Sequence, residues 1–178
     1  MTTQAAISGH EAEHSGPNYI AVFIYLSVLT AIELGVYAMG LPQVAKVGLL
    51  VALAWAKERG AEEALFLDTR GNLSEGTGSN VFVVVDGEIL TPDLASGPLA
   101  GVTRELVVQW CRQEGLTVRE EPLPMSILKQ AAEVFITSST KDVLPVHAID
   151  DQSLAAPGPV TARAAEIFER LSAEFLDP

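Results

Sequence analysis

Hydrophobic and polar positions divide this chain into two parts with different patterns. Residues 18–39 form an almost unbroken apolar run of 22 residues with a single charge, Glu33. A helix of that length, at about 1.5 Å per residue, would cross a hydrocarbon layer of roughly 30 Å. The pattern therefore predicts a membrane-spanning helix over residues 18–39. A second apolar run, residues 47–56, is too short to span and predicts a partial apolar helix.

After residue 57 the pattern becomes that of an α/β (α+β) domain, in which short apolar runs alternate with turn residues. The dipeptide Asp86-Gly87 lies between two apolar runs and is a strong hairpin signal. Gly115 predicts the end of one helix, and Gly158-Pro159 predicts the start of another. The predicted strands are residues 64–68, 81–85, 88–91, 133–137 and 143–146, with a further short extended piece beginning at residues 117–118. The predicted helices are residues 103–114, 126–132 and the segment from 159 onward.

The charges support a division into a polar tail (residues 1–17), a membrane-like helical segment (residues 18–56) and a C-terminal domain (residues 57–178). Of the net charge of −12 over 178 residues, the C-terminal domain carries −10, from 10 Lys and Arg against 20 Asp and Glu. An acidic domain repels phosphate backbones. Nucleic-acid binding is therefore not expected.

Few residues suggest metal or thiol chemistry. His10 and His14 are four residues apart, which on a helix would place both imidazoles on one face. They lie in the polar tail, which we predict to be disordered, so no metal site is expected. Cys111 is the only cysteine, which excludes an intrachain disulfide and a cysteine-based zinc cage. Its apolar neighbours indicate core packing.

Residues 16–54 resemble the start of the bacterial cytochrome c oxidase subunit IV family. The resemblance is carried by Leu29-Thr30-Ala31-Ile32-Glu33 and by the break at Gly40-Leu41-Pro42. It implies a membrane protein in which Glu33 is either a functional intramembrane carboxylate or a residue that reaches the headgroups. The C-terminal domain would then be anchored to the membrane on its cytoplasmic side, and without a span the chain would be cytoplasmic.

The candidate chemistry lies in Glu75-Gly76-Thr77-Gly78-Ser79-Asn80-Val81-Phe82 and in Leu99-Ala100-Gly101-Val102-Thr103-Arg104. The two glycines in the first stretch are expected to place Glu75 on a tight turn. With its spacing, this combination resembles the signature of the class IV aminotransferases. These are the pyridoxal-phosphate enzymes of fold type IV, which include branched-chain and D-amino-acid aminotransferases and aminodeoxychorismate lyase. Residues 57–178 resemble the larger C-terminal domain of that family.

The resemblance implies pyridoxal 5′-phosphate as the cofactor and gives roles to individual residues. The ring nitrogen of this cofactor must stay protonated for it to act as an electron sink, and Glu75 takes the position of the carboxylate beside it. Val102 and Thr103 take the positions that bind the phosphate, where a helix opens with free N–H groups.

The resemblance adds Asn80 to the cofactor-binding residues and places Ser139 and Thr140 near the phosphate and the substrate carboxylate. Lys141 follows them directly. A cation beside this turn would bind substrate and would favour a polyanion such as aminodeoxychorismate over a simple amino acid. A homodimer is the usual assembly of the family.

No catalytic residue is identified, because the family's Schiff-base lysine would fall near Pro42. The lysines ahead of the motif are Lys46 and Lys57, and neither has the family's sequence context. The family's small N-terminal domain, with its phosphate-binding arginine, is also not recognisable. Without that lysine, amino-group transfer should drop by orders of magnitude.

Three hypotheses follow. The first is a truncated class IV enzyme of the transaminase or lyase type, weakly active or inactive, joined near residues 54–57 to a piece of a membrane protein. The second is an oxidase subunit IV-like membrane protein with a passenger domain. The third is a non-catalytic module that binds pyridoxal phosphate.

Overall fold

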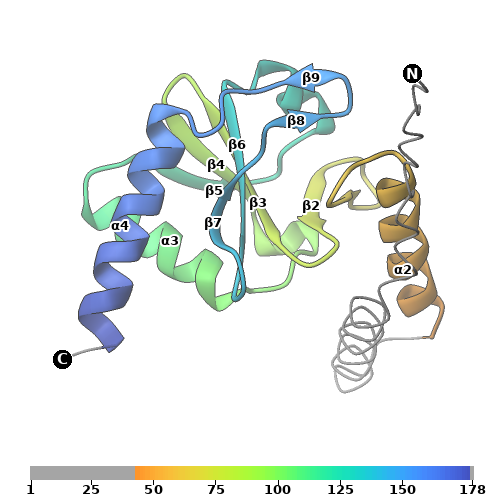
Figure 1. The fold of residues 1–178 in the computed structure, drawn as a ribbon, viewed down its shortest axis with the longest axis horizontal. Helices are drawn as coiled ribbons and strands as arrows, with labels where there is room; N and C mark the ends of the chain where they lie inside the picture. Colours follow the sequence, from red (N-terminus) through yellow and green to blue (C-terminus); the bar gives the residue numbers. More distant parts are fainter. Residues whose placement is uncertain (1–42, 177–178) are drawn as a thin grey trace, which may run out of the picture. The chain divides into compact units, whose positions relative to one another are not determined.

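The computed structural model describes residues 43–176, and Figure 1 shows their fold. The predicted membrane helix over residues 18–39 and the polar tail before it lie outside the described residues. Among the helices that the structure describes, none is long and apolar enough to cross a membrane. The second apolar run does form a helix, α2 (Gln43–Glu58). Residues from Leu49 onward belong to one compact unit, which contains all the features described below.

A five-stranded sheet in the order β5-β4-β3-β6-β7 forms the centre of this unit (Figure 1). Neighbouring strands are antiparallel except β4 and β5, which are parallel. The hairpin predicted at Asp86-Gly87 is confirmed, because both residues have the positive φ that a two-residue turn of this kind requires, 51° and 81°. The strands are β3 (Asn80–Val85), β4 (Glu88–Pro92), β5 (Val118–Glu121), β6 (Glu133–Ser138) and β7 (Asp142–Pro145).

Two helices pack against one face of the sheet, α3 (Val102–Gln113) and α4 (Pro159–Leu176). Both were predicted from helical spacing of apolar residues, and both are confirmed. Phe82 of β3 stacks on Phe135 of β6 with ring centroids 4.7 Å apart, in the cluster that the helices cover. The apolar stripe of each helix thus finds an apolar sheet face, which is where most helical stability in proteins comes from.

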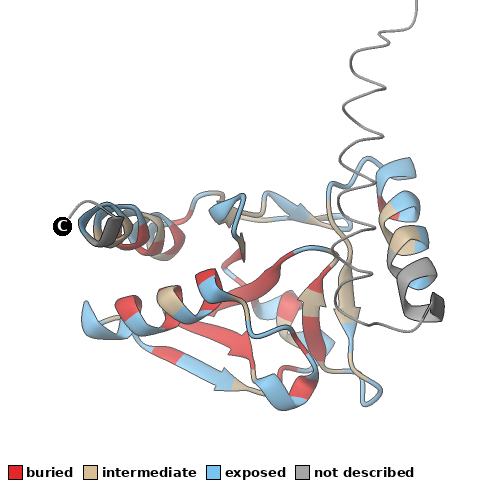
Figure 2. Cartoon of the chain, turned by 90° about the horizontal axis from the view of Figure 1, so that it is seen from below, coloured by how far each residue is buried: buried red, intermediate tan, exposed pale blue. Residues whose placement is uncertain are grey.

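The other face of the sheet is also buried, so β3 is apolar on both sides. Val81 and Val83 point away from the helices into a second cluster with Leu73 and Leu128. Figure 2 shows the buried residues concentrated in the central strands. A short 3₁₀ helix, η2 (Met125–Gln130), covers part of this face where the sequence predicted a short helix over residues 126–132.

The expectation that Glu75 lies on a tight turn is wrong. Glu75 is the third residue of strand β2 (Leu73–Gly76), which pairs with β1 (Leu65–Leu67). The turn follows it, closed by a bond of 2.7 Å from the Gly76 N–H to the Ser79 carbonyl. The glycine, serine and threonine residues around Glu75 are typical of a loop. The segment nevertheless forms a strand, because it pairs with β1 and because Leu73 is buried.

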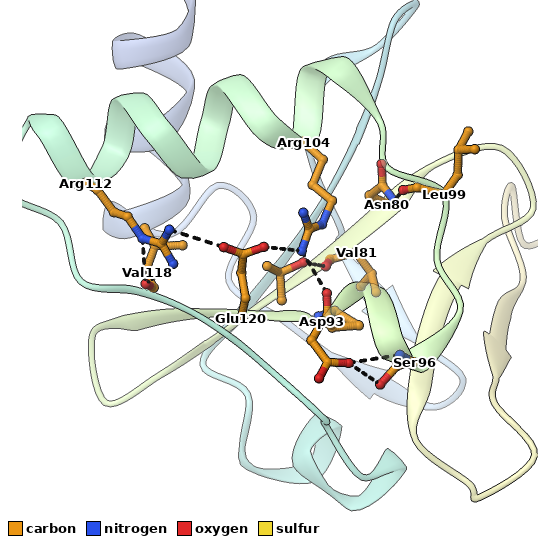
Figure 3. A network of polar contacts seen from close by, with 11 residues as sticks. Asn80, Val81, Asp93, Ser96, Leu99, Arg104, Arg112, Val118 and Glu120 are labelled. Atoms are coloured by element: carbon orange, nitrogen blue, oxygen red, sulfur yellow. Dashed lines mark hydrogen bonds and ion pairs between the residues drawn. The ribbon is translucent and has the colours of Figure 1, made fainter.

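Three further short elements were not predicted: η1 (Leu94–Ser96), β8 (Ala148–Ile149) and β9 (Gln152–Ser153). The 3₁₀ helix η1 is stabilised by Asp93, whose carboxylate accepts from the Ser96 N–H at 2.9 Å and from its hydroxyl at 2.7 Å (Figure 3). Elements of two or three residues carry too little periodicity for a sequence pattern to reveal them.

We expect Cys111 to resist alkylation in the folded protein. Its side chain lies in the core beneath α4, and burial raises the pKa of the thiol to about 11 although Arg163 opposes the shift. At pH 8 only about one thiol in a thousand is then ionised, against about one in four for an ordinary cysteine. Iodoacetamide labelling followed by mass spectrometry should show modification in denaturant only. Rapid labelling of the folded chain would contradict the core position.

Candidate active site

The sequence-predicted site residues gather where three elements meet: the start of β3, the end of β6 and the start of α3. Asn80, the first residue of β3, pairs with Thr137 near the end of β6. The turn containing Ser139 and Thr140 directly follows β6. Gly101, just before α3, lies so close to Asn80 that a Cβ there would be 2.2 Å from the Asn80 Oδ1 atom. The structure thus joins three segments that the sequence separates.

Leu99 is the residue through which Glu75 and Asn80 hold the loop before α3. The Leu99 N–H donates to Glu75 Oε2 at 2.7 Å, and its carbonyl accepts from Asn80 Nδ2 at 2.8 Å. The same carbonyl accepts from the Gly101 N–H at 2.8 Å. Figure 3 shows the Asn80 side chain at Leu99. Leu99 makes these hydrogen bonds through its backbone atoms, so the sequence gives no sign of them.

The N-terminus of α3 is open. Its cap residue is Gly101, which has no side chain to accept from the first turn. In the described part of the chain, no acceptor is bonded to the N–H groups of Val102 and Thr103. Val102 is 76% exposed, while Thr103 is buried with its hydroxyl at the same helix end. Unpaired N–H groups and the positive end of the helix dipole make this terminus suitable for an anion such as a phosphate.

Arg104 anchors this helix end to the sheet (Figure 3). Its side chain is fully buried, and its guanidinium donates to the Pro92 carbonyl at 2.9 Å and to Glu120 at 2.8 Å. Glu120 also pairs with Arg112 at 3.2 Å, further along α3. A buried arginine with one carboxylate and one carbonyl fixes the start of α3 against β4 and β5. The sequence pattern gave no sign of this role for Arg104.

The Glu75 carboxyl is half-buried, and burial raises its pKa, partly offset by the hydrogen bond from the Leu99 N–H. Burial disfavours the charged form because water no longer solvates it. A cation placed beside Glu75 would stabilise the carboxylate. The arrangement is therefore suited to a ligand with a positively charged donor group.

Glu63 is part of the site, and sequence reasoning missed it. Its carboxylate accepts from the Thr77 hydroxyl and from the Gly78 N–H, the latter at 2.7 Å, and lies 3.2 Å from Lys141 Nζ. Lys141, predicted to bind substrate, thus has its charge offset within the protein. An acidic residue before β1 carries no local signal for these contacts, since the partners of Glu63 are 14, 15 and 78 residues away.

The other predicted residues of this region lie at the surface. Ser139, Thr140 and Lys141 are exposed, and the Ser138 and Thr140 hydroxyl oxygens are 3.3 Å apart. Among the residues described, no cluster of His, Cys, Asp and Glu could hold a metal ion. The histidine pair of the polar tail, His10 and His14, lies outside them.

The residues present fit pyridoxal phosphate. The open start of α3 with Thr103 suits a phosphate dianion, and Glu75 suits a protonated ring nitrogen. The two groups belong to segments that Leu99 ties together. The absence of a capping side chain at Gly101 leaves the phosphate without a competing carboxylate at that position.

Known proteins support this interpretation. The family model for amino-transferase class IV matches residues 21–149. A putative branched-chain-amino-acid aminotransferase of Methanocaldococcus jannaschii is 35% identical over 128 residues, which are 72% of this chain and 43% of the relative. The chain therefore spans about two fifths of the length of such relatives.

Two solved structures have the same fold. The branched-chain aminotransferase of Thermobaculum terrenum in its pyridoxal-phosphate form has a TM-score of 0.66 at 34% identity, covering 69% of this chain and 41% of that one. A putative 4-amino-4-deoxychorismate lyase from Legionella pneumophila has a TM-score of 0.67 at 26% identity, covering 69% of this chain and 46% of that one. The fold is therefore similar to both transaminases and lyases.

The family match begins at residue 21, so it also tests the membrane-protein prediction for the N-terminal part of the chain. It includes most of the segment predicted to span a membrane, and none of the comparisons supports cytochrome oxidase subunit IV or a fused membrane protein. That resemblance rested on hydropathy and one short motif, a pattern that many apolar helices share. By the family match over residues 21–149 and the shared fold, this chain belongs to the class IV aminotransferases.

Proposed function

We propose that this chain carries the pyridoxal-phosphate-binding part of a class IV enzyme that transfers amino groups. The observation that carries the proposal is the open N-terminus of α3, joined through Leu99 to the Glu75 carboxylate. An anion site and a carboxylate held by one loop match the two charged ends of this cofactor.

In this proposal the N–H groups of Val102 and Thr103, with the Thr103 hydroxyl, hold the cofactor phosphate. Glu75 keeps the ring nitrogen protonated, and the bound cofactor then supplies an electron sink. Asn80 acts through Leu99 by fixing the loop that leads into α3.

Ser139 and Thr140 complete the proposed site from the turn after β6, beside the phosphate and the substrate carboxylate. Their exposure leaves both side chains and the turn's backbone accessible to a ligand. A second turn contributing donors would fix the phosphate from another direction.

A small amino acid is the proposed substrate. The relatives are named for branched-chain amino acids, and Lys141, the reason to favour a polyanion, pairs with Glu63 at 3.2 Å. Amino-group transfer is therefore favoured over the lyase reaction. Neither Lys46 nor Lys57 has the sequence context of the Schiff-base lysine, so we expect this chain alone to bind the cofactor with weak or no turnover.

Cofactor affinity tests the proposal directly. Pyridoxal-phosphate binding followed by equilibrium dialysis should weaken roughly tenfold in Glu75→Gln and in Thr103→Val, since each variant removes a hydrogen bond to a charged group. Glu62→Gln and Thr117→Val are matched controls, because both residues are exposed. Absence of binding by the unmodified chain, or equal losses in the controls, would contradict the proposed function.

The affinity should also depend on pH through Glu75. Because burial raises the pKa of Glu75, its carboxyl gains a proton at a higher pH than an ordinary glutamate as the solution is acidified. Protonation removes the charge that pairs with the ring nitrogen, so affinity should fall on the acidic side. Glu75→Gln should flatten that limb of the profile.

A further inference from the structure

We propose that Glu63 is a positioning residue that clamps the β2–β3 turn to the β6–β7 turn and thereby sets the geometry of the phosphate site. This inference rests on the proposed function. It assigns a role to a carboxylate that the cofactor itself would not touch.

The contacts of Glu63 reach both turns. One oxygen accepts from the Gly78 N–H at 2.7 Å and from the Thr77 hydroxyl, and the other lies 3.2 Å from Lys141 Nζ. Thr77 and Gly78 belong to the turn after β2, and Lys141 belongs to the turn after β6. One side chain therefore bridges two segments that are distant in sequence.

The packing around Glu63 is close. Its side chain is only 16% exposed, against 36% for Lys141. A Cβ at Gly76 would lie 3.0 Å from Glu63 Oε1 and 2.4 Å from Ser79 Oγ. A side chain at position 76 would collide with the Glu63 carboxylate where it lies over the turn. The glycine in β2 therefore leaves the space that Glu63 occupies.

Each of the two turns that Glu63 joins contains or adjoins residues proposed for the cofactor site. The first follows Glu75 by one residue, and the second contains Ser139 and Thr140. A shift of one turn relative to the other would change the distance between Glu75, proposed to pair with the cofactor ring nitrogen, and the turn that contains Ser139 and Thr140. Small displacements of positioned groups cost binding and catalysis heavily. In this clamp the ion pair between Lys141 and Glu63 has a structural role.

The test compares pyridoxal-phosphate affinity in Glu63→Ala, Glu63→Gln and Glu62→Ala. Glu63→Ala removes both arms of the clamp and should weaken binding on the order of tenfold, the effect of losing bonds to a charged acceptor. Glu63→Gln keeps an oxygen for the Thr77 and Gly78 donors but loses the ion pair, so it should be intermediate. Glu62→Ala removes the same charge from the neighbouring exposed residue and should bind as the unmodified chain does.

Amide hydrogen exchange provides a readout that needs no cofactor. In Glu63→Ala, exchange should speed up in both residues 76–79 and residues 139–143, while the central strands β3 and β6 keep their protection. Unchanged exchange in either turn, or unchanged affinity with Glu63→Ala, would overturn the clamp. If the unmodified chain binds no cofactor, the proposed function fails, and the role of Glu63 in the phosphate site fails with it, whereas the exchange data still decide whether the two turns are joined.

Discussion

Replacing Gly158 with alanine should lower the free energy of unfolding by about 3 kcal/mol, the cost of overpacking combined with a disturbed buried charge. A Cβ at this position would lie 2.1 Å from the Glu133 carboxyl carbon. Glu133 is buried in β6, and its two oxygens accept from the Val160 N–H at 3.1 Å and the Thr161 N–H at 2.7 Å. The added methyl group must displace the carboxylate that caps α4.

Thermal unfolding measures this effect, with an expected decrease in Tm of roughly 10 °C for a domain of this size. Gly78→Ala is the matched control, because Gly78 has no positive φ and a Cβ added there would meet no heavy atom within 4 Å. In a Glu133→Ala background the Gly158→Ala change should cost much less, since the clashing carboxylate is gone. Additive losses in the double variant would show that Gly158 acts through something other than Glu133.

Replacing Gly101 with alanine should weaken pyridoxal-phosphate binding by roughly one to two orders of magnitude, because it displaces the helix end that we propose binds the phosphate. The added Cβ would lie 2.2 Å from Asn80 Oδ1. Asn80 is buried and bonded to the Leu99 carbonyl, so it has little room to retreat. Gly101 has φ −69° and ψ 136°, which any residue adopts, so the requirement for glycine is one of space.

Cofactor affinity and thermal unfolding, measured together, separate the two consequences of this change. We expect a modest loss of stability, about 1–3 kcal/mol for overpacking, and a larger relative loss of binding. Ala100→Ser adds one heavy atom at the neighbouring exposed position and should leave both quantities near those of the unmodified chain. Binding that survives Gly101→Ala unchanged would argue against the start of α3 as the phosphate site.

The sequence predicted most of the regular elements because their signals are local. The Asp86-Gly87 turn requires positive φ, and helices such as α3 show apolar residues at helical spacing. Pro145 predicted a strand end, and it is the last residue of β7, at the edge of the sheet. Strand β2 was missed because its composition is that of a loop and its pairing with β1 is not local.

The sequence also predicted which residues belong to the candidate site, but not the contacts that bring them together. Glu75, Asn80, Val102 and Thr103 were chosen by spacing that resembles a family signature, and the structure brings their segments together at Leu99. Their roles toward the cofactor stay predictions. The membrane segment could not be decided from hydropathy, since an apolar run of the right length is compatible with several environments.

The sequence alone determined the hairpin, the two long helices and the family, and it predicted which residues would bind a cofactor with two charged ends. Only the tertiary structure decided how these are held: Glu63 pairs with Lys141, 78 residues away, Glu133 caps a helix 27 residues away, and Arg104 ties α3 to β4 and β5. Local rules act through backbone dihedrals and periodicity, which neighbouring residues reveal. A buried carboxylate or guanidinium is satisfied by whichever donors and acceptors the folded chain brings near it, so its partners become visible only in three dimensions.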